Sequence, residues 1–357
     1  MEGLLCLSSG LQPQYKLDIL RLLALPKGAS IQFRYGEDLI DDAVQESLSL
    51  NRGIGTKVLL AYVNCSATAR RTDNTCPIVP CRFGILRNSR VAGSRFILEL
   101  QLDDFAFCTD LEAFHKKLPS RSPSWVEGED LPQGLWCLET VVSEMDAGVP
   151  SPQTTAWERI VTSLHAADDF SQETLFFRFE SLSELKATKS LDPAQAEYRL
   201  KSGKNYEINI YHFHPKGDES VMSRGDALIS VQVSSPLIES VSNPAMPIDS
   251  PYDVKTFRLR TALTTTSQYG FIVVRIEDRA TGKAIESQPE LYVSAEVRPA
   301  IFKPLLFTVL LGGFLAGQQL LTISATKPPV SSATIIGTIL IGVVTAGIAV
   351  FGLKKPM

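Results

Sequence analysis

Two stretches near the end of the chain are apolar over their whole length and contain no charged residue. They cover residues 305–324 and 333–353, and the segment between them holds Pro328 and Pro329, which cannot continue a helix. A helix rises about 1.5 Å per residue, so each stretch matches a hydrocarbon core roughly 30 Å thick. The pattern predicts a two-helix transmembrane hairpin within residues 299–357. A pair of buried core helices is the alternative, which the length and the lack of charge disfavour.

Basic residues flank this predicted hairpin unevenly. Arg298 and Lys303 precede the first stretch, Lys354 and Lys355 follow the second, and the connection holds only Lys327. Because basic residues concentrate on the cytoplasmic side of a membrane, the flanks predict a multi-pass protein of the inner (cell) membrane. Both termini would then be cytoplasmic, and the lipid bilayer would be one partner.

Alternating apolar and polar positions dominate residues 1–114. After a helical pattern at residues 12–25, which Pro26 and Gly28 end, strands are expected at residues 29–35, 57–63, 80–87 and 94–102. In the last of these, Phe96, Leu98 and Leu100 share one face. The pattern predicts a small β-rich N-terminal domain with a leading helix.

Residues 115–187 have a different pattern and are interpreted as a connecting α/β region. A helix is expected at residues 154–167, because its apolar residues recur at positions that form one stripe on a helix. This stripe consists of Trp157, Ile160, Val161 and Leu164. A strand is expected to follow the helix.

Residues 188–298 contain strand patterns at roughly regular spacing, separated by Pro, Gly, Ser and Asn. The expected strands cover residues 205–213, 227–233, 254–263, 269–278 and 290–297, with a short edge strand near 196–200. This spacing predicts a β-sandwich that is immunoglobulin-like in plan, although the cysteine and tryptophan hallmarks of immunoglobulin domains are absent. The predicted fold class of the whole chain is α+β, mostly β.

Charge is distributed unevenly in the first domain. Residues 52–95 hold eight basic residues and one acid, Asp73, a net charge of +7 in a chain whose formal charge is −4. Arginine binds phosphate and carboxylate groups through two parallel hydrogen bonds, so the segment predicts a site for an anionic ligand, such as a nucleotide, or for a protein partner. The candidate binding residues are Arg70, Arg71, Arg82, Arg87, Arg90 and Arg95. Pairing with neighbouring acids is the alternative. Nucleic acid is less expected, because only Phe83 and Phe96 offer aromatic stacking.

Small and polar residues mark the predicted membrane segments. Small residues let helices approach closely in lipid, so they predict packing within the hairpin and a homo-oligomer. The packing residues are Gly313, Gly317, Thr334, Thr338, Gly342 and Ala346. Gln318 and Gln319 are intramembrane polar residues, expected to hydrogen-bond across helices or to line a pore.

No motif of catalysis is evident in the sequence, and we predict no catalytic residue, cofactor or metal. All six cysteines lie within the first 137 residues, and we expect free thiols in a reducing compartment. A metal site of Cys65, Cys76, Cys81 and Cys108 is the alternative to packing thiols. His212 and His214 share one face of a strand, but a third ligand is not evident nearby.

In its order of domains the chain resembles the membrane effectors of bacterial anti-phage systems, which join a cytosolic sensing domain to short transmembrane helices. The resemblance implies a membrane-anchored cytoplasmic sensor or effector that binds an anionic ligand or partner and perturbs the membrane by oligomerising. A constitutive membrane scaffold that presents the sandwich to a partner is the second hypothesis. A membrane-bound enzyme that uses residues 115–187 is the third.

Overall fold

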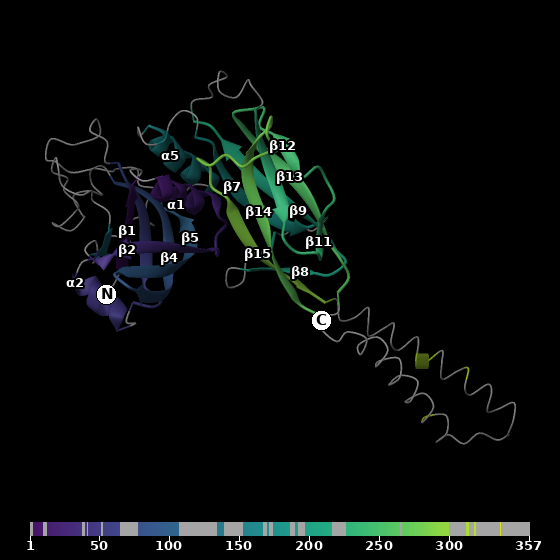
Figure 1. Ribbon diagram of the computed structural model, residues 1–357, viewed down its shortest axis with the longest axis horizontal. Helices are drawn as coiled ribbons and strands as arrows, with labels where there is room; N and C mark the ends of the chain where they lie inside the picture. Colours follow the sequence, from purple (N-terminus) through teal and green to yellow (C-terminus); the bar gives the residue numbers. More distant parts are fainter. Residues whose placement is uncertain are drawn as a thin grey trace.

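The computed structural model describes residues 3–9, 13–37, 40, 42–50, 53–64, 78–106, 134–138, 153–166, 170, 174–185, 190–191, 197–215, 226–264 and 266–299, with residues 312, 313, 318 and 336. These residues form two β-rich units side by side, and helix α5 (Gln153–His165) lies at their junction (Figure 1). Helix α1 (Pro13–Ala24) contacts strands of both units, so the junction is built mainly from helices.

The first unit is a six-stranded sheet with the order β2-β5-β4-β3-β1-β6. Its strands are β1 (Gly3–Ser9), β2 (Ser30–Gly36), β3 (Lys57–Val63), β4 (Ile78–Ala92), β5 (Arg95–Phe105) and β6 (Gly134–Leu138). β3 has the predicted bounds, and β4 and β5 extend the predicted strands into a long hairpin. The turn of that hairpin places Gly93 at a φ of 65°, which glycine adopts without strain. The edge strands β2 and β6 also contact each other, so the sheet is curled.

Helices cover one face of this sheet. Alternation along β5 directs Leu98, Leu100 and Leu102 to that face, where they join the buried cluster that includes the apolar side of α1. Helix α2 (Asp42–Ser49) packs on the same face, since Ser89 Oγ, which lies opposite Leu98, donates to Leu48 O. Ile97 and Glu99 point to the opposite face. The two faces of the β2-β5-β4 region therefore differ in kind, one apolar and covered, the other polar.

The second unit is a sandwich of two sheets, with the orders β12-β10-β14-β15-β8 and β11-β13-β9-β7. The strands are β7 (Phe176–Glu184), β8 (Glu197–Lys201), β9 (Asn205–Phe213), β10 (Ala227–Val233), β11 (Ile238–Ser240), β12 (Ala245–Pro247), β13 (Tyr252–Thr261), β14 (Gln268–Asp278) and β15 (Leu291–Arg298). Ile208 and Phe257 of one sheet share a buried cluster with Ile272 and Val293 of the other. β9 and β10 have the predicted bounds, and β8 is the expected edge strand.

The region between the two predicted domains divides between both units. β7 forms an edge of the four-stranded sheet of the sandwich. In α5 the predicted stripe is confirmed, because Trp157, Ile160, Val161 and Leu164 are all fully buried. Trp157 Nε1 donates to Leu23 O of α1 at 3.0 Å, and its ring centre is 5.6 Å from that of Tyr211 on β9. This tryptophan therefore joins the two units.

The predicted transmembrane hairpin was wrong. In the ranges that the structure describes, no helix is long and apolar enough to cross a membrane. Of residues 305–324 and 333–353 these ranges include only Gly312, Gly313, Gln318 and Ile336, and the other predicted packing and polar residues lie outside them: Gly317, Gln319, Thr334, Thr338, Gly342 and Ala346. The fold class is therefore corrected to mostly β without the hairpin. The inner-membrane location, the bilayer as partner and the membrane keywords are withdrawn with it.

The error has a physical reason. A lack of charge shows only that a stretch avoids water, and it does not establish a continuous helix of bilayer length.

Candidate functional site

Of the six predicted binding arginines, Arg82 has a structural role inside the protein. It is 1% exposed, its Nε donates to Asp103 O at 2.7 Å, and its Nη1 donates to Leu22 O at 2.8 Å and Leu25 O at 2.6 Å. The last two carbonyls lie at the end of α1, where a cation is favourable. Burial lowers the pKa of Arg82 to about 9, which still leaves it charged at neutral pH. Arg82 therefore fixes α1 to the sheet. Arg70 and Arg71 lie outside the described residues.

Arg90 and Arg95 are exposed on the face of the first sheet that the helices leave open. Ile97 of β5 lies opposite Arg90 of β4 on one side and opposite Arg34 of β2 on the other. Residues directly opposite each other point to the same face, so Arg34, Ile97 and Arg90 form one row across three strands. Arg95 lies two residues before Ile97 in β5 and points to the same face. The sheet thus adds Arg34, which lies outside the basic segment 52–95, to the predicted residues.

We call the exposed surface formed by Arg34, Arg87, Arg90 and Arg95 the arginine face. Arg87 donates from Nε to Gln101 Oε1 at 2.8 Å and from Nη2 to the same oxygen, whereas none of the four has an ion pair with any described residue. Among the described residues that lie between these arginines on the sheet face, Glu99 of β5 is the one carboxylate. Four guanidinium groups and one carboxylate give this surface a net charge of +3. It can accept carboxylate or phosphate oxygens without breaking an existing ion pair.

A groove runs along β2 beside the arginine face. It has a volume of about 1050 Å³, and its walls are α1, β2 and the start of β15. Arg34 and Arg95 line it together with Tyr15 of α1 and Tyr292 of β15. Asp18 of α1 pairs with Arg21 at 3.0 Å, and Glu37 and Glu290 also line the groove, so its lining holds three acidic and three basic residues. We call this feature the β2 groove.

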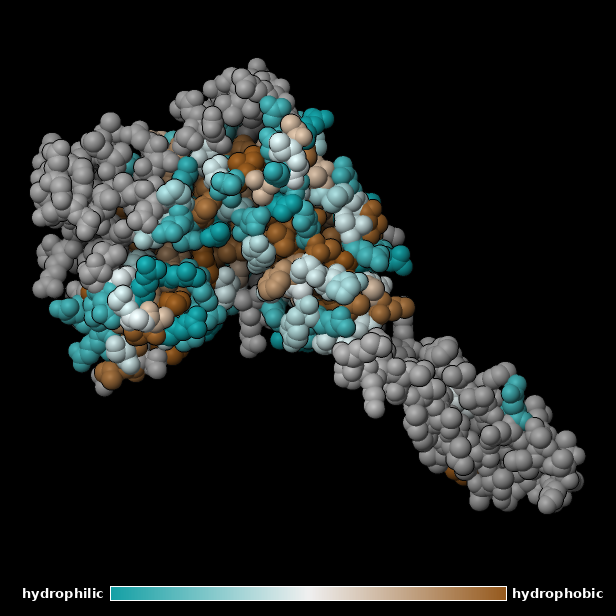
Figure 2. Space-filling view, viewed as in Figure 1, coloured by the Kyte–Doolittle hydropathy of each residue, from teal (hydrophilic) through white to brown (hydrophobic). Residues whose placement is uncertain are grey.

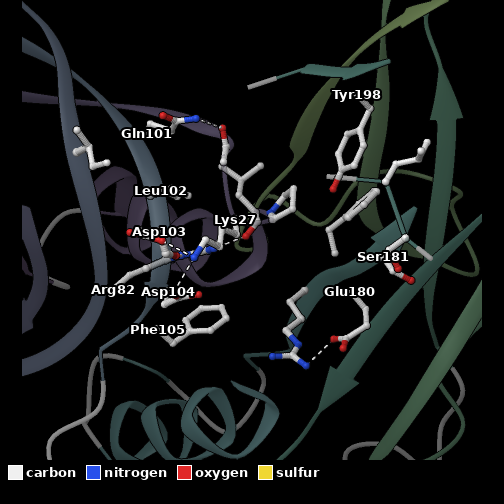
Figure 3. Close-up of a pocket in the computed structure, with 18 residues that line it drawn as sticks. Lys27, Arg82, Gln101, Leu102, Asp103, Asp104, Phe105, Glu180, Ser181 and Tyr198 are labelled. Atoms are coloured by element: carbon white, nitrogen blue, oxygen red, sulfur yellow. Dashed lines mark hydrogen bonds and ion pairs between the residues drawn. The ribbon is translucent and has the colours of Figure 1, made fainter. Parts of the chain in front are cut away.

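A smaller cavity of about 520 Å³ lies between the two units, in a hollow where apolar residues are visible (Figure 2). Lys27, Asp103 and Asp104 lie on one side of it, and Glu180, Ser181 and Tyr198 lie on the other (Figure 3). Lys27 Nζ is 2.6 Å from Asp103 and 2.7 Å from Asp104, so the cation is already neutralised. Although burial opposes ionisation, the hydrogen bond from Lys27 holds the pKa of Asp103 below its usual value.

On the sandwich side of this cavity, Arg178 pairs with Glu180 at 2.5 Å. Its guanidinium lies 5.1 Å from the ring centre of Trp157 and 5.4 Å from that of Tyr211, in an arrangement typical of cation–π contacts. The charges around the cavity are therefore already paired, each within its own unit. This makes the cavity a weaker candidate for an anion site than the arginine face.

Cys6 and Cys81 are the cysteines whose side chains the structure describes, and both are buried. Burial raises the pKa of Cys6 and of Cys81 to about 12, which keeps both thiols protonated. Cys65, Cys76 and Cys108 lie outside the described ranges. The His165 ring is 5.1 Å from that of His214, but no three described His, Cys, Asp or Glu residues are placed to hold a metal ion.

No protein-family model and no curated protein matches this chain. Among solved structures, it is similar in part to the CsuC–CsuE chaperone–tip adhesion subunit pre-assembly complex of the archaic chaperone-usher Csu pili of Acinetobacter baumannii (12% identity, TM-score 0.20, 29% of this chain and 54% of that chain). A GH5 xyloglucanase of Bacteroides ovatus in complex with a XXXG heptasaccharide has 13% identity and a TM-score of 0.18 over 31% of this chain and 19% of its own.

The cupredoxin domain of amoB from Nitrosocaldus yellowstonii has 11% identity and a TM-score of 0.17, over 27% of this chain and 57% of that domain. The chain thus covers less than two thirds of each of these three structures. Likeness at this level assigns neither a fold nor a function. The resemblance to membrane effectors depended on the hairpin and is not retained. The functional proposal therefore depends on the site itself.

Proposed function

We propose that the chain is a non-enzymatic binding protein whose arginine face binds an acidic segment of a partner protein. One observation supports this most strongly: Arg34, Arg90 and Arg95 are exposed on one sheet face without an ion pair to any described residue. Exposed ion pairs contribute only about 0.2–1 kcal/mol each, so binding requires several carboxylates placed opposite several of these arginines.

A protein partner fits this face better than nucleic acid does. Binding of single strands combines positive charge with aromatic side chains on which the bases stack. Phe96 is 3% exposed and points to the helix-covered face, and Phe83 is half-buried on β4. The described part of the arginine face therefore supplies charge and an aliphatic centre, Ile97, and the aromatic residues Tyr15 and Tyr292 lie in the adjacent β2 groove.

A small anionic ligand such as a nucleotide fits less well. Small-molecule sites are concave and enclose most of their ligand. The cavity between the units has its cations paired with Asp103, Asp104 and Glu180, whereas the unpaired arginines lie on the sheet face and along the β2 groove. A groove that follows a whole strand suits an extended protein segment.

Binding of the full-length chain to fluorescent poly-L-glutamate, measured by anisotropy, tests the proposal. The triple variant R34E/R90E/R95E should lose at least about tenfold in affinity, since each reversal replaces attraction by repulsion. The matched control is R199E/R260E/K283E, which makes the same change in charge at exposed sites of the sandwich and should stay within about twofold of the wild type. Equal loss in both variants would refute a specific site. Binding of single-stranded DNA in preference to poly-L-glutamate would indicate nucleic acid instead.

A further inference from the structure

β2 is an edge strand, and the direction of its backbone groups can be assigned. Leu102 N donates to Ala29 O at 2.8 Å, and Glu37 N donates to Ser94 O at 3.1 Å. Because bonding to one neighbour recurs at every second residue of an antiparallel strand, Ile31, Phe33 and Tyr35 also bond to β5. The N–H and C=O groups of the alternate residues point to the free edge. These residues are Ser30, Gln32 and Arg34.

Apart from a contact with β6, this free edge is open to another strand. Among the described residues, no hydrogen bond reaches the backbone groups of Ser30, Gln32 or Arg34 on that edge. The β2 groove follows the strand along its whole length, from Ser30 to Gly36. Unpaired edges of this kind are the sites at which extended peptides join a sheet.

We propose that an extended segment of the partner binds in the β2 groove as an added strand beside β2. This inference rests on the proposed function and specifies how the acidic segment is held. Main-chain hydrogen bonds to Ser30, Gln32 and Arg34 fix its position, and its charge is recognised by Arg34 and Arg95, the two residues of the arginine face that line the groove. The occupant is a peptide strand, because only a main chain presents donors and acceptors at the spacing of β2.

The groove also specifies the side chains of that strand. Side chains of an added strand alternate between its two faces. One set lies on the side of Arg34 and Arg95, where acidic residues are favoured. The other set lies toward α1 and β15, where Tyr15, Leu17 and Tyr292 favour apolar residues. The preferred segment therefore alternates acidic and apolar residues over about six positions, a length typical of strands.

N-methylated peptides test the added strand directly. The probe is a fluorescent peptide of alternating glutamate and valine, titrated against the full-length chain. N-methylation of one alternate set of residues should weaken binding at least about tenfold, and methylation of the other set should change it less than about threefold, because only one set faces β2. Equal effects of both sets would refute strand addition.

A proline variant makes the same test on the protein. Gln32→Pro removes a donor from the free edge without breaking a bond to β5, and edge strands tolerate proline. The control is Arg199→Pro in β8, since Ser202 N donates to Arg298 O and the N–H of Arg199 therefore points away from β15. Q32P should lose at least about tenfold in affinity, and R199P less than about twofold.

The two proposals fail in different ways. If Q32P binds the peptide as tightly as R199P while R34E/R90E/R95E does not bind, the arginine face remains and the added strand is refuted. If the wild type binds neither poly-L-glutamate nor the alternating peptide, the proposed function itself is refuted. Should Q32P fail to fold, the methylated peptides still decide the question.

Discussion

The sandwich and the first sheet both expose basic residues, but only the sandwich neutralises most of its own. Arg258 pairs with Glu207 at 3.1 Å, Arg275 with Glu277 at 2.7 Å and Arg298 with Glu296 at 2.7 Å. On the arginine face, no described residue forms an ion pair with Arg34, Arg87, Arg90 or Arg95. Exposed ion pairs stabilise a fold by only about 0.2–1 kcal/mol, so the contrast concerns binding more than stability.

Two arginines of a single strand make the same contrast. Arg82 and Arg90 both belong to β4, yet Arg82 is buried against three backbone carbonyls and Arg90 is exposed. The number of arginines in a segment therefore does not locate a binding surface. The relevant property is whether the guanidinium group already forms hydrogen bonds or ion pairs within the protein.

Trp157→Ala should have the largest effect, because this residue joins the two units. The side chain is fully buried and its Nε1 donates to Leu23 O. Removing a buried tryptophan costs about 3–5 kcal/mol. Urea unfolding should show this loss, whereas the control Tyr252→Ala, at a residue 65% exposed, should change stability by less than about 0.5 kcal/mol. A loss below about 1 kcal/mol would show that the units are held together elsewhere.

Acid should destabilise the sandwich through His212. Burial and the nearby charge of Lys255 lower its pKa to about 4, while Asp253 and Asp249 oppose this. The unfolded chain, with a pKa near 6.5, therefore takes up the proton first, and stability falls as the pH drops from about 6.5 to about 4, by about 3 kcal/mol. Urea unfolding at several pH values measures this slope.

His212→Leu is the variant that isolates this effect. It should remove most of the pH dependence between about 6.5 and 4. Asp249 and Asp253 contribute only below this window, because the hydrogen bonds from Lys255 hold their pKa below the ordinary value. If the variant keeps the wild-type slope, another group is responsible.

Arg82→Met should destabilise the fold by about 2 kcal/mol, because it leaves buried carbonyls without a donor. It should leave anion binding intact. The matched control in the same strand is Arg90→Met, which should keep the stability and weaken binding to poly-L-glutamate severalfold. Unfolding and anisotropy on both variants make the comparison. Reversed results would show that the assignment of the two arginines is wrong.

Much of the fold follows from the sequence, because a half-buried strand alternates apolar and polar residues and a half-buried helix has an apolar stripe. Strands β3 and β9 and the buried stripe of α5 were predicted for this reason. The arginine face was predicted only in part. Counting charges along a segment cannot separate Arg82 from Arg90, and it misses Arg34, which only the pairing of β2 with β5 brings beside Ile97. The strand pattern of residues 29–35 was the available signal. The hairpin failed because apolarity alone does not specify a helix.

The smallest effect on stability is expected for the arginine face itself. R34E/R90E/R95E should change the free energy of unfolding by less than about 0.5 kcal/mol, since these side chains are exposed and make no ion pair with a described residue. Urea unfolding of this variant and of R199E/R260E/K283E should give similar curves. A loss above about 2 kcal/mol would show that the arginines support the fold.

The most direct test follows the arginine side chains themselves. In the NMR spectrum of the full-length chain, the Nε–Hε signals report on each guanidinium group as poly-L-glutamate is added. We predict shifts for Arg34, Arg90 and Arg95, and unchanged signals for Arg258, Arg275 and Arg298 of the sandwich. Shifts confined to the sandwich, or bound polyanion without a shift at the arginine face, would contradict the account.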